Sequence, residues 1–170
     1  MSRRITLIIG VIVIVTAAML ARAGQQVPPT AAAPAQLQAP FIAAATPEQA
    51  GRYFILIGGC NDCHTPGWRE SKGALPEAQW LTGSANGFTG PWGTSYPYNL
   101  RLMVQQMSEE KWVDTFMTKQ ANPPMPWFNY TADKLNRADA VSTYRFIRQL
   151  GPAGAPAPKF VPPASPPGTP

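Results

Sequence analysis

Both cysteines and the single histidine of this 170-residue chain stand within five consecutive residues, Cys60-Asn61-Asp62-Cys63-His64. This scarcity excludes a scaffold built on several disulfides, a zinc site with four Cys or His ligands, and any site that needs two histidines. Whatever the chain does with thiol and imidazole chemistry is therefore confined to this one short segment.

The spacing of the three groups, C-x-x-C-H, is the attachment signature of a c-type haem. Where a chain turns at the end of a helix, two thiols three positions apart can reach the two vinyl-derived carbons at one porphyrin edge. The adjoining imidazole then faces the iron. We therefore predict one haem c per chain, attached covalently through Cys60 and Cys63, with His64 as an iron ligand.

The second axial position needs another residue type, because the chain has no second histidine. The methionines that follow the apolar N-terminal segment are Met103, Met107, Met117 and Met125. Met107 and Met117 lie beside or within a predicted helix, where methionine commonly fills the core. Met125 lies in Asn-Pro-Pro-Met-Pro-Trp (122–127), whose prolines prevent a helix and favour a fixed loop. We predict His64 and Met125 as the two metal ligands.

Three segments have the apolar spacing and the capping residues of helices. The first runs from Thr46, a good N-cap followed by Pro47, to the glycine pair at 58–59. The second begins after Ser108, and the third extends from about residue 132 to 150.

The stretch from residue 66 to 100 is rich in Gly, Pro and Trp and lacks the alternation of a strand, so it is predicted as loop. The predicted fold is therefore all-α. A small domain of three to four helices would wrap around one covalently attached haem, with long loops and Pro-rich flanks.

The N-terminus has the organisation of an export signal. Arg3 and Arg4 precede an apolar stretch over residues 5–20, and Ala21-Arg22-Ala23 is a small-x-small site. We predict that residues 1–23 are a signal peptide cleaved after Ala23, which places the protein in the periplasm. The alternative is a retained anchor on the periplasmic face of the inner membrane, with membrane contact through residues 5–20. That run is slightly shorter than the ~20 residues that span a bilayer.

Two Pro-rich segments flank the predicted domain of residues 46–151. Residues 24–45 are rich in Ala, Pro and Gln, carry no charge, and are predicted as a linker. Residues 152–170 contain eight prolines and favour extended polyproline geometry. This tail is predicted to be either disordered or a strap on the domain surface, with Phe160 and Val161 as its docking points.

The formal net charge of +5 is concentrated at the N-terminus. Arg3, Arg4 and Arg22 supply three of the positive charges, so the chain from residue 24 onward carries +2. No cluster of Lys or Arg could follow a phosphate backbone, and we do not expect nucleic-acid binding.

The order of these features is similar to that of the single-haem cytochromes c: helix, C-x-x-C-H, loops, helix, Met in a Pro-rich loop, final helix. The similarity covers residues 46–150. Residues 90–96, Gly-Pro-Trp-Gly-Thr-Ser-Tyr, followed by Asn99-Leu100, resemble a loop in cytochrome subunits of bacterial membrane-bound dehydrogenases. Arg101 stands where those subunits have Thr.

The resemblance implies two structural details. The first and last helices should cross beside the haem, with Gly51, Phe54 and Ile55 facing Ala140 and Tyr144. The second nitrogen of the histidine should donate to a backbone carbonyl, for which spacing suggests Pro76. Between the cysteines, Asn61 and Asp62 are predicted to face solvent.

Two strong axial ligands leave no vacancy for oxygen or peroxide, so we predict electron transfer rather than enzyme catalysis. The protein would be a mobile carrier or an electron-transfer subunit of a respiratory or dehydrogenase complex. Its partners would be redox proteins, such as a membrane-bound dehydrogenase or oxidase. Two alternatives stay open: a five-coordinate haem protein that binds gases or acts as an enzyme, and a haem-free thiol or metal-binding module.

Overall fold

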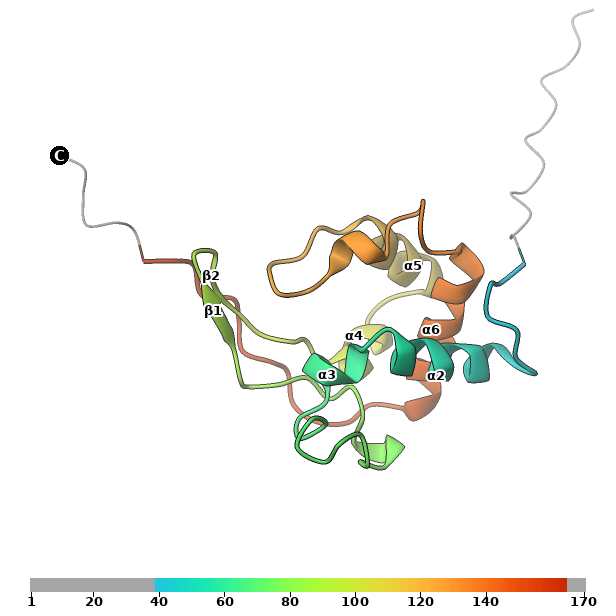
Figure 1. Ribbon diagram of the computed structural model, residues 1–170, viewed down its shortest axis with the longest axis horizontal. Helices are drawn as coiled ribbons and strands as arrows, with labels where there is room; N and C mark the ends of the chain where they lie inside the picture. Colours follow the sequence, from blue (N-terminus) through green and yellow to red (C-terminus); the bar gives the residue numbers. More distant parts are fainter. Residues whose placement is uncertain (1–38, 165–170) are drawn as a thin grey trace, which may run out of the picture. The chain divides into compact units, whose positions relative to one another are not determined.

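The structure is a computed structural model that describes residues 39–164 (Figure 1). The elements of this part are α2 (Pro47–Ile57), α3 (Cys60–His64), the 3₁₀ helix η1 (Glu77–Gln79), β1 (Phe88–Gly90), β2 (Gly93–Ser95), α4 (Leu100–Gln105), α5 (Glu109–Thr118), the 3₁₀ helix η2 (Trp127–Asn129) and α6 (Arg137–Leu150). The proposed signal peptide or anchor, residues 24–38 of the linker and residues 165–170 of the tail lie outside the described residues. Among the helices of residues 39–164, none combines the length and the apolar character that crossing a bilayer requires.

The prediction of an all-α fold is wrong. Strands β1 and β2 form an antiparallel hairpin, with Phe88 opposite Ser95 and Gly90 opposite Gly93, so the fold is mixed α/β. Gly93 adopts a φ of +102°, which only glycine reaches without strain. This Gly- and Pro-rich stretch carries no alternating apolar pattern, and part of its pairing comes from a distant segment, where Val161 pairs with Thr94.

The three predicted helices form, and their caps explain where they begin. The Thr46 side chain accepts a hydrogen bond from Gln49 N at 3.2 Å at the start of α2, and Ser108 caps α5 in the same way. Helix α6 begins later than predicted, because Asn136 caps it by accepting from Ala138 N at 2.7 Å. Helix α4, which the sequence analysis missed, is capped by Asn99.

The helices α2 and α6 cross in extensive contact, as Figure 1 shows. Gly51 makes the close approach possible, since a Cβ at this position would lie 2.0 Å from the carbonyl oxygen of Ser142. The predicted crossing is therefore present, but the atoms nearest to Gly51 belong to Ser142 and Phe146 rather than to Ala140 or Tyr144.

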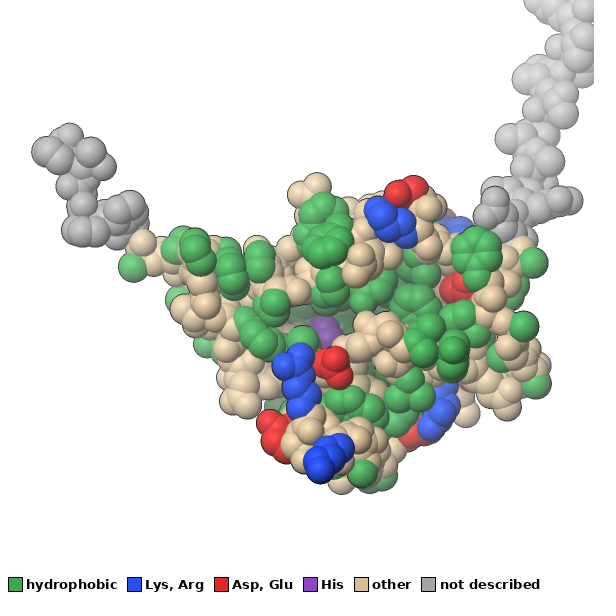
Figure 2. Space-filling model, viewed as in Figure 1, with side chains coloured by type: hydrophobic (Ala, Val, Ile, Leu, Met, Phe, Trp, Pro, Cys, Tyr) green, Lys and Arg blue, Asp and Glu red, His purple; other side chains and the backbone are tan. Residues whose placement is uncertain are grey.

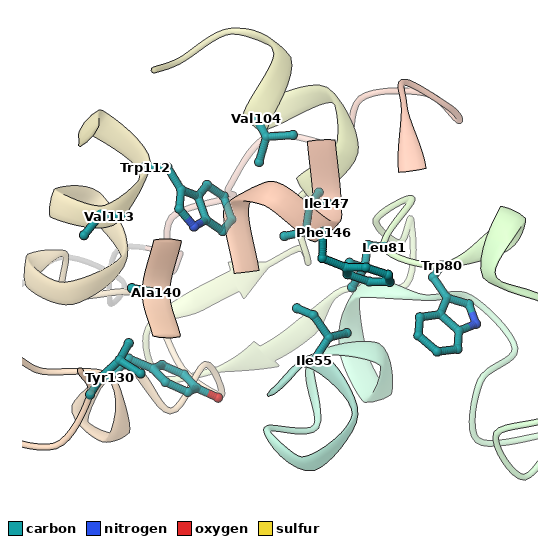
Figure 3. Close-up of a cluster of buried hydrophobic side chains, with 11 residues drawn as sticks. Ile55, Trp80, Leu81, Val104, Trp112, Val113, Tyr130, Ala140, Phe146 and Ile147 are labelled. Atoms are coloured by element: carbon teal, nitrogen blue, oxygen red, sulfur yellow. The ribbon is translucent and has the colours of Figure 1, made fainter. Parts of the chain in front are cut away.

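The core is one cluster of buried side chains drawn from α2, α4, α5, α6 and the connecting loops (Figure 3). Its members are Ile55, Trp80, Leu81, Val104, Trp112, Val113, Tyr130, Leu135, Ala140, Phe146 and Ile147. The Trp112 indole nitrogen donates to Thr143 Oγ1 at 3.0 Å, so the polar atom of this large side chain is satisfied inside the core.

Arg101 is a buried cation that closes the C-terminal end of α6. Its side chain is 5% exposed and donates to the carbonyl oxygens of Gly151 at 2.6 Å, Ala78 at 2.7 Å, and Leu150. The last carbonyls of a helix lack intrahelical partners and carry partial negative charge, so a guanidinium is well suited to this position.

The folded unit begins before residue 46. Asp139 in α6 accepts from the backbone nitrogens of Phe41 at 3.0 Å and Ile42 at 3.2 Å. Asn136 donates to the carbonyl of Ala39 at 2.8 Å. The last residues of the predicted linker are therefore held against the start of α6.

We expect Gly51→Ala to lower the free energy of unfolding by about 2–3 kcal/mol, because the added methyl group forces α2 away from α6. Intrinsic helix propensity alone would favour alanine by about 1 kcal/mol, so the sign of the change is diagnostic. Urea unfolding followed by circular dichroism measures it. Gln49→Ala, on an exposed position of the same helix, is the control. A Gly51→Ala protein as stable as the control would contradict the crossing.

We expect Arg101→Met to destabilise the fold by about 2–3 kcal/mol, because it removes the charged hydrogen bonds that the buried guanidinium makes to three backbone carbonyls. Arg101→Lys should not restore stability, since one ammonium cannot reproduce the planar fork. The matched control is Arg145→Met, which removes only an exposed ion pair with Glu109 and should cost less than about 1 kcal/mol. Equal thermal midpoints for the two Met variants would refute this role.

Candidate functional site

The four residues that the sequence predicts for the site line one cavity. Cys60, Cys63 and His64 come from α3, and Met125 comes from the loop before η2. Figure 2 shows the single histidine, in purple, inside an opening with hydrophobic side chains above and beside it and acidic and basic side chains below it in this view. Residues far apart in the sequence are thus brought to one place by the fold.

The glycine pair after α2 sets the direction of the thiols. Gly58 ends α2, and Gly59 adopts a φ of +68°, which lets the chain change direction before α3 begins at Cys60. In a helical turn, residues three and four positions apart share one face. Cys60, Cys63 and His64 therefore present their side chains toward the same side, and the two thiols are not bonded to each other.

His64 is 9% exposed, and its Nδ1 lies 2.7 Å from the carbonyl oxygen of Tyr98. A carbonyl only accepts, so Nδ1 carries the proton and Nε2 keeps its lone pair. Burial lowers the pKa of His64, and the hydrogen bond to Tyr98 opposes this effect only in part. Because the pKa is lowered, the imidazole is neutral at pH 7. The prediction that the carbonyl of Pro76 accepts this hydrogen bond is wrong. The chain after α3 returns to the site at Tyr98, whose carbonyl accepts it.

The two thiols are not poised for thiolate chemistry. Burial raises the pKa of Cys60 to about 12. Burial also raises the pKa of Cys63, although Arg69 opposes the change. Reactive cysteines of redox-active pairs have pKa values below the ordinary one, because the thiolate is the nucleophile. The environment of this pair is therefore of the opposite kind.

The Met125 loop is held by contacts from several directions. Its own backbone bonds run from Met125 N to Asn122 O at 3.2 Å and from Trp127 N to Met125 O at 2.9 Å. The Tyr130 hydroxyl donates to the carbonyl of Gly58 at 3.1 Å and so ties the loop to the end of α2. Met125 itself is half-buried.

The other methionines divide into two groups. Met103 in α4 also lines the cavity, whereas Met107 and Met117 do not. All three pack against the core cluster, as the sequence analysis expected of Met107 and Met117. Met103 is therefore the other methionine that the fold places beside the cysteines and the histidine.

The cavity wall is mostly apolar and includes residues that the sequence analysis did not assign to a site. Ile55, Trp112, Phe116, Tyr130 and Ile147 line it from the helical side. The hairpin contributes Phe88 and the C-terminal segment contributes Pro158 and Phe160. For the C-terminal segment, the sequence had indicated only that Phe160 could dock on the domain. Among the described residues that line the cavity, Lys119 is the only Lys or Arg, and its Nζ lies 5.4 Å from the centre of the Tyr98 ring.

The residues between the cysteines differ from each other. Asp62 is exposed, as predicted, but Asn61 is only 1% exposed. The Asn61 side-chain oxygen accepts from Thr65 Oγ1 at 2.7 Å, and Thr65 Oγ1 accepts from Leu81 N at 2.8 Å. Asn61 therefore anchors α3 to the loop behind it and is not a solvent-facing spacer.

The donor set and the wall fit the haem that the motif predicts: two unbonded thiols on one face of a helical turn, a neutral imidazole with a free Nε2, and a thioether around an apolar cavity. Within the described residues, no three His, Cys, Asp or Glu side chains gather closely enough to hold a metal ion by themselves. Comparisons with protein-family models, curated proteins and solved structures find no match for this chain.

Proposed function

We propose that this protein transfers single electrons through one c-type haem, attached at Cys60 and Cys63 and ligated by His64 and Met125. The observation that carries the proposal is the convergence of these four side chains on one apolar cavity. A haem bound there supplies a one-electron iron couple. The resemblance to single-haem cytochromes c supports the same function.

The chain's own groups suit an electron carrier. The Tyr98 carbonyl fixes the ring orientation of His64 and increases its basicity as a ligand. The Met125 thioether, as a ligand, would raise the reduction potential of a bound haem. The apolar wall limits water at the site and would also favour the less charged reduced state. In this proposal these residues bind and orient the haem, and none of them transfers a proton or forms a bond to a substrate.

The haem-free alternative has less support. Its thiol form would need a cysteine with a lowered pKa, whereas burial raises the pKa of both thiols. Its metal form would need a cluster of ligands around Cys60, Cys63 and His64, and among residues 39–164 no three His, Cys, Asp or Glu side chains are placed to hold a metal ion. The electron-transfer function accounts for all three residues at once.

The proposed setting is the periplasm, either as a free carrier or held at the inner membrane. The proposed partners are redox proteins, including a membrane-bound dehydrogenase or oxidase. Tyr98 and Phe160 line the cavity and are 49% and 36% exposed, so they offer an apolar rim for such a partner. The small net charge outside the N-terminus implies little electrostatic steering.

We expect the protein from haem-maturation-competent cells to carry the added mass of one haem, retained under denaturing conditions. Intact-mass measurement and a peroxidase stain of a denaturing gel check this. The double variant Cys60→Ser and Cys63→Ser should lose the covalent haem, because neither thioether can form. An unstained wild-type band from such cells would refute the proposed function.

We expect Met125→Ala to keep the covalent haem, to lose the weak far-red Met-to-iron band of the oxidised form, and to bind carbon monoxide. Its reduction potential should decrease, because axial ligands set the potential over a range of about 0.8 V. Optical spectroscopy and potentiometry measure these changes. Met107→Ala, outside the cavity wall, is the control. If the band survives in Met125→Ala and disappears in Met103→Ala, the ligand is Met103.

A further inference from the structure

We propose that the described part of the C-terminal tail, residues 152–164, is a strap that positions the Met125 loop and acts through β2. The consequence for iron ligation rests on the proposed function. The positioning itself is a property of the chain and can be tested with or without haem.

The strap is bound at both of its ends. Near its start, the buried Asn99 side chain donates to the carbonyls of Ala153 at 2.7 Å and Ala155 at 3.1 Å. Near its end, Val161 exchanges two backbone hydrogen bonds with Thr94 in β2, at 2.8 and 2.9 Å. Figure 1 shows this segment running beside the hairpin. The described part of the tail is therefore a strap and not a free extension.

The contact between strap and hairpin requires a residue without a side chain. A Cβ on Gly93 would lie 2.2 Å from the carbonyl oxygen of Val161 and 2.8 Å from the backbone of Pro162. The strap thus lies directly on the backbone of β2. A close approach of this kind fixes the position of β2 as well as that of the strap.

The next residue of β2 connects the strap to the ligand loop. Ser95 follows Thr94, and its hydroxyl donates to the carbonyl of Pro123, two residues before Met125. Pro123, Pro124 and Pro126 have no backbone N–H, so the loop can make few backbone hydrogen bonds of its own. The hydrogen bond from Ser95 therefore contributes more to the stability of this loop than a single external bond contributes to the stability of a helix.

The contacts form one continuous path from Val161 to Thr94, Ser95, Pro123 and the Met125 loop. Pro158 and Phe160 of the same strap line the cavity that Met125 faces. Release of the strap should therefore loosen the loop and widen access to the site. In the haem-loaded protein, this would make Met125 easier to displace by an external ligand.

The first test measures hydrogen exchange of the amides of Met125 and Trp127 by mass spectrometry of purified protein, whatever its haem content. Val161→Pro removes the N–H that donates to Thr94, while the half-exposed side chain contributes little packing. Val161→Ala keeps the backbone pair and is the matched control. We expect Val161→Pro to speed exchange in the loop about fivefold, as for the loss of one net hydrogen bond, and Val161→Ala to leave it unchanged.

The route through β2 is tested by a double-mutant cycle. Ser95→Ala cuts the path, so adding Val161→Pro to it should have no further effect on the loop. Exchange in α2 should stay at the wild-type rate in every variant, which separates loosening of the loop from unfolding. A chain truncated after Ala157 should behave like Val161→Pro. Unchanged loop exchange in both strap variants, or additive effects in the double variant, would overturn the proposal.

The second test uses the haem-loaded protein and imidazole as the probe. Val161→Pro should raise the affinity of the oxidised protein for imidazole about fivefold relative to Val161→Ala, with the haem still attached. If the chain carries no haem, the proposed function fails, and hydrogen exchange still decides the role of the strap. If the far-red band is present but imidazole affinity does not change, the consequence for iron ligation is wrong, the proposed function stands, and hydrogen exchange decides whether the strap positions the loop.

Discussion

The hydrogen bond between His64 Nδ1 and the Tyr98 carbonyl is the interaction on which the candidate site depends. It fixes which ring nitrogen carries the proton, and so it leaves the other nitrogen available as a ligand. It also ties α3 to the residue before Asn99, the cap of α4. Without it, a buried imidazole would lack a partner, and the segment that carries the hairpin would keep Gly83 N to His64 O as its bond to the C-x-x-C-H turn but lose the one that follows the hairpin.

This bond is effective because its two ends rest on rigid parts of the fold. On one side, α3 follows α2, which Gly51 allows to lie against α6. On the other side, α4 begins at Asn99 and includes Arg101, which binds the end of α6. Both partners of the His64 bond are therefore positioned by contacts with the same helix, α6. These contacts lie outside the cavity, so the imidazole is held in place without other cavity-lining side chains.

The helix starts predicted correctly from the sequence depend on a few neighbouring residues. Thr46 and Ser108 cap helices through bonds to amides three residues away. The C-x-x-C-H segment likewise forms one helical turn of its own, which brings its three side chains to one face. The β-hairpin was missed because its three-residue strands, which contain Gly90 and Gly93, carry no alternating apolar pattern, although their pairing is local. The carbonyl for His64 could not be chosen from spacing, since every residue offers one and only the path of the loop selects Tyr98. The burial of Asn61 also depends on the path of the loop, because its partner Thr65 accepts from the backbone nitrogen of the distant Leu81.

The four residues proposed to hold the haem differ in what keeps them in place. Cys60, Cys63 and His64 belong to one turn of helix, so their mutual geometry is local and stiff. Met125 lies in a Pro-rich loop that Ser95 and Tyr130 hold from outside. If the chain holds the proposed haem, substitutions in the strap or hairpin would change the strength of the Met125 ligand while the covalent attachment stayed intact. Because an axial ligand strongly influences the reduction potential of a haem, the potential of the proposed centre would then be adjustable far from the C-x-x-C-H turn.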